Sequence, residues 1–315
     1  MTRNKRIDLI QLLSPLAIVV LVVIFTSINK NFLSVRNISN ILMDICPLLL
    51  CASGVSFVLL VGGIDLSIGS VISCASIMLT VTLPILGVGA YALTLMFGVV
   101  AGMINGWIYI RFQIPSFIVT LGTMSIWQSA AYLIAPAPVL IPRPYWALIS
   151  WARFSVGLFS TSFFISIIVV ALCWFIQQRT ATGRIMYAIG VNETAARLSG
   201  LNTARAKMAA FILSGFFCSF AGILLTSKLR SGTPTVGESF GMLGIAAVCL
   251  GGASLSGGKG SAFGTLLGVL LVIIIQNGMA LASVGAFWQN IVFGILIIVA
   301  ICLTVDRNAR NAVVK

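Results

Sequence analysis

Two long stretches of this chain carry no charged side chain, and they limit the fold more than any other feature. Residues 66–110 and residues 260–305 are each free of Asp, Glu, Lys and Arg. A membrane-spanning helix needs about 20 apolar residues. Each stretch is therefore long enough for two crossings, with turn signals near its middle, at 84–89 and 283–285. A soluble surface cannot be built with 8% charged residues and six acidic side chains. The sequence therefore predicts an all-α polytopic membrane protein.

The apolar runs continue along the whole chain, which indicates one transmembrane domain over residues 1–315. They predict about ten membrane helices, with eight as the alternative count. The predicted segments are 9–29, 41–61, 67–83, 88–110, 114–135, 161–178, 208–227, 240–251, 262–281 and 286–304. The eighth segment is too short to cross a bilayer alone, so we expect it to be a half-helix or to begin earlier than the apolar run.

The placement of basic residues predicts the orientation. Thirteen of the 19 Lys and Arg residues fall in segments that ten helices place in the cytoplasm when the N-terminus lies inside. The six others fall in external segments: Lys30, Arg36, Arg143, Arg153, Lys228 and Arg230. Cytoplasmic loops of membrane proteins carry such an excess, so both termini are predicted to be cytoplasmic. The same bias accounts for the net charge of +13. We therefore expect no nucleic-acid partner, because no basic cluster lies on a fold able to present it.

The composition also argues against chemistry catalysed by this chain. It contains no histidine, and its seven cysteines lie in apolar segments without a CxxC pair. The stretch 251–261, GGASLSGGKGS, fails the nucleotide-loop pattern G-x-x-x-x-G-K-[ST]. Ala253 replaces its first glycine, and Gly260 replaces its hydroxyl residue. We expect no enzyme activity, no metal and no cofactor bound by this chain.

The motif GGxxLS occurs twice, at 62–67 and at 251–256, each time after an apolar run. Glycine ends a helix and Asp or Ser begins the next, so each motif predicts a broken membrane helix. Such breaks are buried in protein or line a watery cavity, although two glycine-rich tight turns are the alternative. Asp65 is either a helix cap or a functional intramembrane carboxylate. The candidate translocation-path residues are Gly62, Gly63, Asp65, Ser67, Asn105, Thr120, Gly251, Gly252, Ser254 and Asn277.

Residues 179–207 form the longest hydrophilic stretch and carry five basic side chains. Within it, Asn192 suits an N-cap, Glu193 suits the first turn and Gly200 suits a C-terminal stop. These signals predict one short helix of about two turns, which would be marginal alone in water. We expect it to dock against another protein, with a merely solvated loop as the alternative.

Five stretches resemble the permease subunits of bacterial ATP-binding-cassette importers for monosaccharides, the group that includes ribose, xylose, arabinose and autoinducer-2. They run in order through nearly the whole chain: GGIDLSIGS (62–70), GMING (102–106), PSFIVTLGTM (115–124), GRIMYAIGVNETAARLSGLN (183–202) and IAAVCLGGASLSGGKGSAFGTLLG (245–268). Departures from the family pattern occur at Gln128-Ser129, in place of a common Arg-Gly pair, and at Gly241 and Leu243, in place of Glu and Asp. They weaken the expectation of ribose itself more than that of the family, and leave a different small polyol, sugar or sugar-like ligand open.

The resemblance implies a pore made of two permease chains, as a homodimer or heterodimer, in the bacterial inner membrane. A cytoplasmic ATPase would hold ATP and Mg²⁺, and a periplasmic or lipid-anchored binding protein would deliver the sugar. Transport would proceed by alternating access, and 179–207 would be the segment that couples to the ATPase. The implied coupling residues are Gly183, Arg184, Tyr187, Gly190, Asn192, Glu193, Ala195, Ala196, Arg197 and Gly200. An ion-gradient-driven secondary transporter is the alternative function.

Overall fold

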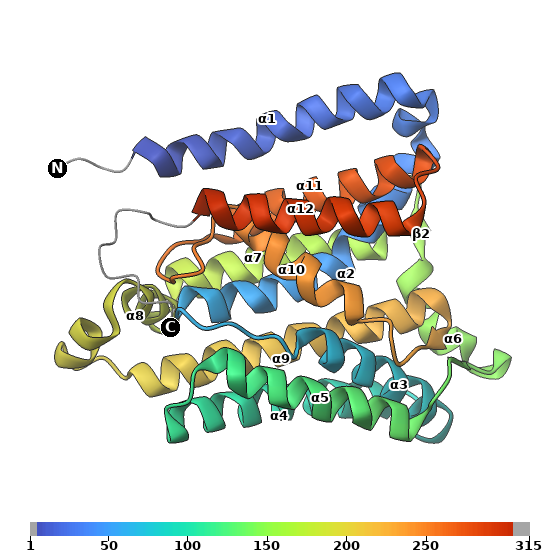
Figure 1. The fold of residues 1–315 in the computed structure, drawn as a ribbon. Helices are drawn as coiled ribbons and strands as arrows, with labels where there is room; N and C mark the ends of the chain where they lie inside the picture. The colour runs from blue at the N-terminus through green and yellow to red at the C-terminus, as the bar shows by residue number, and fades with distance from the viewer. Residues whose placement is uncertain (1–4, 305–315) are drawn as a thin grey trace.

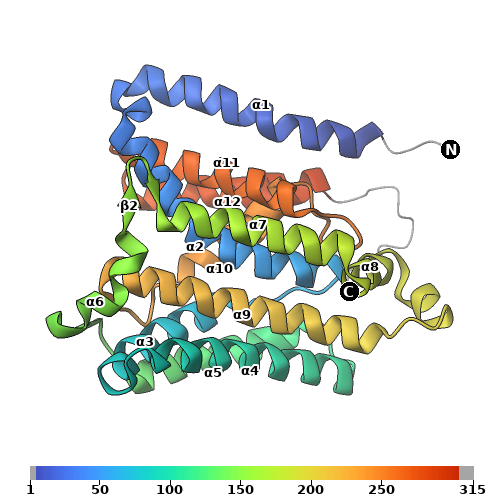
Figure 2. The ribbon, with the colours of Figure 1, turned by 180° about the vertical axis from the view of Figure 1, so that it is seen from behind.

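The computed structural model describes residues 5–304, which form a bundle of long helices lying side by side (Figures 1 and 2). Each of the ten predicted segments coincides with a helix. These helices are α1 (Lys5–Ile28), α2 (Val35–Leu60), α3 (Ile68–Leu86), α4 (Gly89–Phe112), α5 (Ser116–Ile134), α7 (Thr161–Arg179), α9 (Thr203–Leu229), α10 (Glu238–Leu250), α11 (Ala262–Leu281) and α12 (Ala286–Thr304).

Seven of the described helices are long and apolar enough to cross a membrane, namely α2, α3, α4, α5, α7, α9 and α11. Three shorter apolar helical stretches accompany them, at Ser14–Ile28, in α10 and at Ala286–Val299. Helix α10 has 13 residues, which corresponds to about 20 Å of helix against a hydrocarbon layer of roughly 30 Å. The prediction of a half-helix at this place is confirmed.

Helix α2 forms the centre of the bundle. It packs against α7, α9, α10 and α11, and nearly every side chain from Ile45 to Leu60 is buried. A helix that is apolar on all sides is expected in such a position. Around this centre, α9 also packs closely on α4, because a Cβ on Gly98 would lie 2.3 Å from the carbonyl oxygen of Gly215. Small residues allow this backbone approach where packing drives helix association in lipid.

One end of the bundle carries α8 (Ala181–Leu198), between α7 and α9. Helix α1 begins and α12 ends at this same end (Figure 1). The chain termini, predicted to be cytoplasmic, lie outside the described residues. The prediction of a single short helix within 179–207 was incomplete, because helix also precedes Asn192. The N-cap of α8 is Thr180, whose hydroxyl accepts a hydrogen bond from the Gly183 amide at 3.1 Å.

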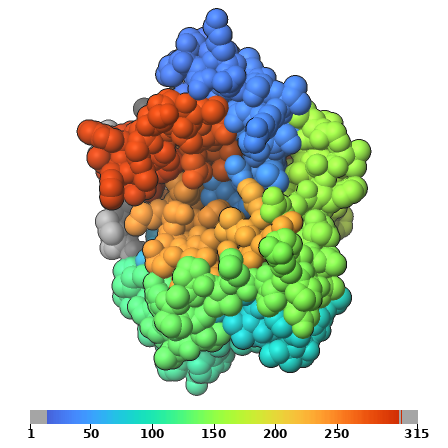
Figure 3. All heavy atoms as spheres, turned by 90° about the vertical axis from the view of Figure 1, so that its right-hand side faces the viewer, coloured from blue at the N-terminus to red at the C-terminus, as the bar shows by residue number. Residues whose placement is uncertain are grey.

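The opposite end, seen face-on in Figure 3, is built from short elements. The segment 136–160, between α5 and α7, contains most of them. They are η1 (Lys30–Leu33), β1 (Val139–Leu140), η2 (Arg143–Tyr145), α6 (Trp146–Ile149), η3 (Ser150–Arg153), β2 (Ser155–Val156), β3 (Phe159–Ser160) and β4 (Ser231–Gly232). Strand β1 pairs antiparallel with β4, and β2 pairs antiparallel with β3. The first pair ties the loop to the chain that follows α9.

Candidate functional site

The first predicted break lies between α2 and α3, where the chain leaves helical geometry from Val61 to Ser67. Gly62 has a φ of +75°, which a residue with a Cβ adopts only under strain. Side chains of α5 bind the freed backbone amides. The Ile64 amide donates to the Ser116 hydroxyl at 2.9 Å, and the Leu66 amide donates to the Thr120 hydroxyl at 3.0 Å. The break is therefore stabilised within the protein, as irregular backbone at membrane depth requires.

A buried hydrogen-bond network surrounds Asp65, whose side chain is 4% exposed. One carboxylate oxygen accepts from the Ser67 amide at 3.0 Å and from the Ser67 hydroxyl at 2.6 Å. The other oxygen accepts from the Ser214 hydroxyl of α9 at 2.8 Å. Asn105 of α4 donates to the Ser67 hydroxyl at 2.8 Å and accepts from the Thr123 hydroxyl of α5 at 2.7 Å. The network thus links the start of α3 to α9 through Asp65 and to α4 and α5 through Ser67 and Asn105.

The network gives Asp65 a structural role. Its carboxylate accepts from the Ser67 amide just before α3 begins at Ile68, and its part in transport stays a prediction. Ser214 and Thr123 were not among the predicted residues. No local signal marks them, since Ser214 is 149 positions from Asp65 and lies within an apolar run.

The second break, residues 251–261 between α10 and α11, is a compact turn. Gly252 has a φ of +89°, and the Ser254 amide donates to the Lys259 carbonyl at 3.1 Å. The Ser254 hydroxyl accepts from the Ser256 amide at 3.2 Å. A Cβ on Gly251 would lie 2.1 Å from the Gly264 carbonyl oxygen, so the turn is pressed against the start of α11.

The two breaks meet each other and α8 at one point, which we call the break junction: Leu60, Gly62, Gly190, Gly257 and Gly258. The Gly258 amide donates to the Leu60 carbonyl at 3.0 Å. A Cβ on Gly190 would lie 2.0 Å from the Gly258 nitrogen and 2.1 Å from the Leu60 oxygen. A Cβ on Gly257 would lie 2.8 Å from both the Gly190 Cα and the Gly62 nitrogen. The backbones of α8, the first break and the second break therefore touch without intervening side chains. A movement of α8 toward them at Gly190 would displace both breaks.

Helix α8 bends at Asn192, which has φ −162° and ψ 102°. Its side-chain oxygen accepts from the Ala195 amide at 2.9 Å, and Gly200 follows the helix end with a φ of +79°. The predicted short helix with these two ends is therefore confirmed. Before the bend, the Tyr187 hydroxyl donates to the Gly260 carbonyl at 2.7 Å. Burial raises the pKa of this phenol above its ordinary value.

The predicted coupling residues divide into an inner and an outer set. Gly183, Gly190 and Tyr187 contact the chain's own α7 and second break. Ala196 is 5% exposed, so it faces the bundle and not the outer surface of the short helix, and its part in coupling stays a prediction. The outer set is exposed and consists of Arg184, Asn192, Glu193, Ala195, Arg197 and Gly200.

A cleft of about 530 Å³ separates the short helix from the first break. Glu193, Arg197 and Lys207 line one side, and Gly62 and Ser116 lie on the other. Lys207 forms an ion pair with Glu193 at 2.5 Å, and its ammonium lies 4.7 Å from the centre of the Tyr109 ring. The ion pair therefore binds the short helix to α9, and the same lysine contacts the Tyr109 ring of α4.

A second cleft, of about 640 Å³, lies between α3, α5 and α10. Its wall includes Ser125, Gln128, Ser129 and Glu238, polar side chains on helices whose outer faces are otherwise apolar. Polar groups are costly against lipid, so this wall is suited to face water or protein. Ser125 and Glu238 are exposed, and Gln128 donates to the Pro234 carbonyl at 2.8 Å.

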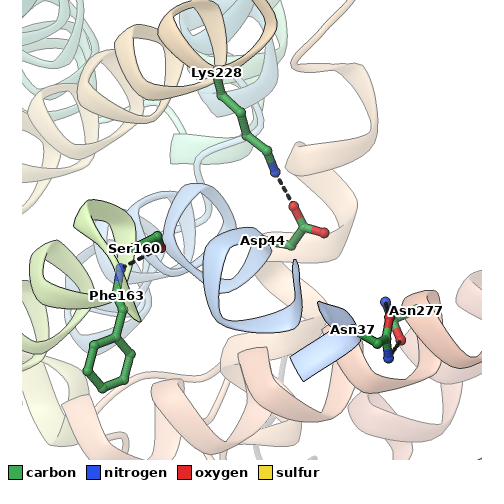
Figure 4. Close-up of polar contacts among 6 residues, drawn as sticks. All are labelled: Asn37, Asp44, Ser160, Phe163, Lys228 and Asn277. Atoms are coloured by element: carbon green, nitrogen blue, oxygen red, sulfur yellow. Dashed lines mark hydrogen bonds and ion pairs between the residues drawn. The ribbon is translucent and has the colours of Figure 1, made fainter. Parts of the chain in front are cut away.

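The predicted path residues are not all brought together. Asp65, Ser67, Asn105 and Thr120 gather at the first break, and Gly251, Gly252 and Ser254 form the second. Asn277 lies apart, since its amide exchanges hydrogen bonds of 2.8 and 3.0 Å with Asn37 (Figure 4). Figure 4 also shows Asp44 of α2 paired with Lys228 of α9. Sequence reading missed this pair, because the two residues lie 184 positions apart.

The fold and the paired breaks define a multi-pass membrane protein with the internal architecture of a transporter. Residues 37–301 match the family model of the permease component of branched-chain amino acid transport systems. The chain belongs to this family.

Curated relatives cover nearly the full length of the chain. The ribose import permease protein RbsC of Haemophilus influenzae is 36% identical over 93% of this chain and 92% of its own. RbsC of Bacillus subtilis is 36% identical over 98% of both chains. The D-allose transport system permease protein AlsC of Escherichia coli is 32% identical over 90% of this chain and 88% of its own. No solved structure matches the chain.

Proposed function

We propose that this chain is the transmembrane pore subunit of an ATP-driven importer for a monosaccharide or a similar small polyhydroxylated solute. The observation that carries the proposal is the break junction, where α8 touches both broken helices, in a chain whose relatives are ribose and allose import permeases. The protein would lie in the bacterial inner membrane with α8 in the cytoplasm. ATP and Mg²⁺ would be bound by a separate ATPase subunit.

The ATPase would dock on the outer set of α8. Val191 and Leu198 are 75% and 82% exposed there, on either side of Glu193 and Arg197. Exposed apolar side chains beside charges are typical of a protein-binding surface. A push on the short helix would reach both breaks through Gly190, because no flexible side chain lies between the three backbones. Alternating access would follow as a rigid-body change in the packing of the bundle.

A second permease chain, identical or related, would cover the cleft between α3, α5 and α10. Two observations support this surface: α5 is mostly exposed along its length, and its exposed side includes Ser125. In such a dimer the polar walls of two facing clefts would form the pore. A periplasmic or lipid-anchored sugar-binding protein would dock at the end opposite α8.

A neutral solute agrees with the charges of the bundle. Asp65 is the only carboxylate that is buried among the side chains whose burial the structure describes, and it already accepts three hydrogen bonds. Gradient-driven transporters commonly use intramembrane carboxylates as proton or ion sites. No observation on this chain therefore favours an ion-gradient mechanism.

The proposal is tested by purifying the tagged chain from its native membranes and identifying what copurifies by mass spectrometry. We expect an ATPase and a periplasmic binding protein, and uptake of the binding protein's sugar by liposomes that contain the complex and internal ATP. A chain that purifies alone and moves solute without ATP, in a manner abolished by an uncoupler, would contradict the proposal.

A further inference from the structure

A second, smaller cavity lies on the other side of α10 from the 640 Å³ cleft, in the half of the bundle opposite α8. Its volume is about 190 Å³, and it is lined by residues of α2, α9, α10 and α11. Its polar lining is Asp44, Lys228, Ser239 and Gln276. The remaining lining is apolar and comprises Pro47, Leu48, Leu225, Phe240, Leu243 and Ile273. We call it the outer cavity.

The charged pair of the outer cavity joins α2 to the end of α9 and is partly buried. Asp44 is nine residues into α2, a helix that is long and apolar enough to span a membrane, so it is about 14 Å from the helix start. Lys228, one residue before the end of α9, reaches inward and pairs with it (Figure 4). The side chains of Lys228 and Asp44 are 22% and 44% exposed. A partly buried charged pair that converges with other polar groups in a largely apolar cavity is a candidate for a binding role.

The polar groups of the cavity have unused bonding capacity. A carboxylate offers about four acceptor sites and an ammonium three donors, whereas the pair uses one oxygen of Asp44. In the part of the chain that the structure describes, no hydrogen bond reaches the second oxygen of Asp44, the Ser239 hydroxyl or the Gln276 amide. Unused acceptor and donor positions therefore converge on one small space, which is open to solvent at Ser239.

We propose that the outer cavity binds one neutral polyhydroxylated molecule of monosaccharide size. The Asp44 carboxylate would accept from its hydroxyls, and the Lys228 ammonium and the Gln276 amide would donate to them. The volume corresponds to roughly six waters at the ~30 Å³ that each occupies in the liquid, which suits one sugar ring. Leu48, Leu225 and Phe240 provide apolar surface for its C–H faces. The opposite charges cancel, so the site does not require a charged ligand.

Helix α10 connects this site to the proposed pore. Ser239, Phe240 and Leu243 line the outer cavity, whereas Glu238, Gly241 and Met242 of the same helix line the 640 Å³ cleft. A ligand held in the outer cavity would therefore bias the position of a half-helix that also forms the pore wall. The inference rests on the proposed function for the class of ligand, but the cavity and its charges do not depend on it.

The test is titration of the purified full-length chain in lipid nanodiscs with D-ribose, D-allose and L-leucine, followed by ligand-observed NMR. We expect saturable binding of at least one sugar. Asp44→Asn is expected to weaken it by about tenfold or more, since a hydrogen bond to a charged group is lost. Ser239→Trp, which fills the mouth of the cavity without removing a charge, is expected to do the same. The matched control is Ser27→Trp in α1, an exposed serine that lines neither the outer cavity nor the two clefts, and it should bind sugar as the wild type does.

A charge swap separates ligand binding from a purely structural ion pair. The double variant Asp44→Lys, Lys228→Asp keeps the pair but exchanges donor and acceptor, so it should recover thermal stability without recovering sugar affinity. Recovery of both, binding of L-leucine alone, or no saturable sugar binding by the wild type would each overturn the inference. The titration needs no ATPase, so its result is read independently of ATP-driven uptake, on which the proposed function depends.

Discussion

Replacement of Gly190 by alanine is the most direct test of the break junction. The added Cβ would lie 2.0 Å from the Gly258 nitrogen and 2.1 Å from the Leu60 oxygen. Both atoms belong to backbones, so an ordinary contact requires a displacement of at least about 1.3 Å. Overpacking of this kind costs about 1–3 kcal/mol, and the higher helix propensity of alanine offsets about 1 kcal/mol. Because both clashing atoms are backbone, we expect the upper end of this cost, and therefore a net loss of stability of about 2 kcal/mol together with a displaced α8.

The assay is thermal unfolding of the purified chain together with ATP-driven uptake in liposomes that contain the whole complex. Gly190→Ala should lower the melting temperature by a few degrees. It should also reduce uptake at temperatures where the variant is folded, since α8 no longer rests on both breaks. The matched control is Gly122→Ala in α5, where nothing lies within 4 Å of the new Cβ. It should be as stable as the wild type or slightly more so. Wild-type unfolding and uptake in Gly190→Ala would refute this account of the junction.

Three further predictions address the short helix, the first break and the polar pair near the outer end. Glu193→Arg reverses the charge that faces Lys207, and Gly200→Pro forces a negative φ where the chain has +79°. Each variant should abolish uptake. Membrane insertion, measured by protease protection, should stay normal. Asp65→Asn should keep much of the thermal stability and uptake, because asparagine caps nearly as well and the serine hydroxyls can rotate. Asp65→Ala loses three hydrogen bonds and should be destabilised by several kcal/mol. Equal melting temperatures of Asp65→Asn and Asp65→Ala would contradict the cap role. Asn37→Ala should lower the free energy of unfolding by about 1 kcal/mol or more, because it leaves the Asn277 amide unpaired. The double variant Asn37→Ala, Asn277→Ala should lose less than the sum of the two single losses, as measured by denaturation.

Much of the fold follows from local sequence. The ten helices coincide with apolar runs, because a helix satisfies its own backbone and its length is set by the bilayer. The breaks at Gly62 and Gly252 and the ends of the short helix at Asn192 and Gly200 were also predictable. Positive φ and side-chain capping depend on one residue and its nearest neighbours. The helix before Asn192 was missed because its cap, Thr180, lies in a stretch whose polarity suggested a loop.

The tertiary structure alone decided how these parts meet. Ser214 reaches Asp65 across 149 positions, and Lys228 reaches Asp44 across 184; neither pair produces a period in the sequence. The sequence around Gly190 likewise gave no sign that this residue touches both breaks. Nor did it indicate that Ala196 faces the bundle. Helix packing joins residues by their distance in space, so cavities and polar networks arise only when several helices are in place. The sequence by itself therefore determined that this chain is a bundle of membrane helices with two breaks, whereas the tertiary structure placed both breaks against α8.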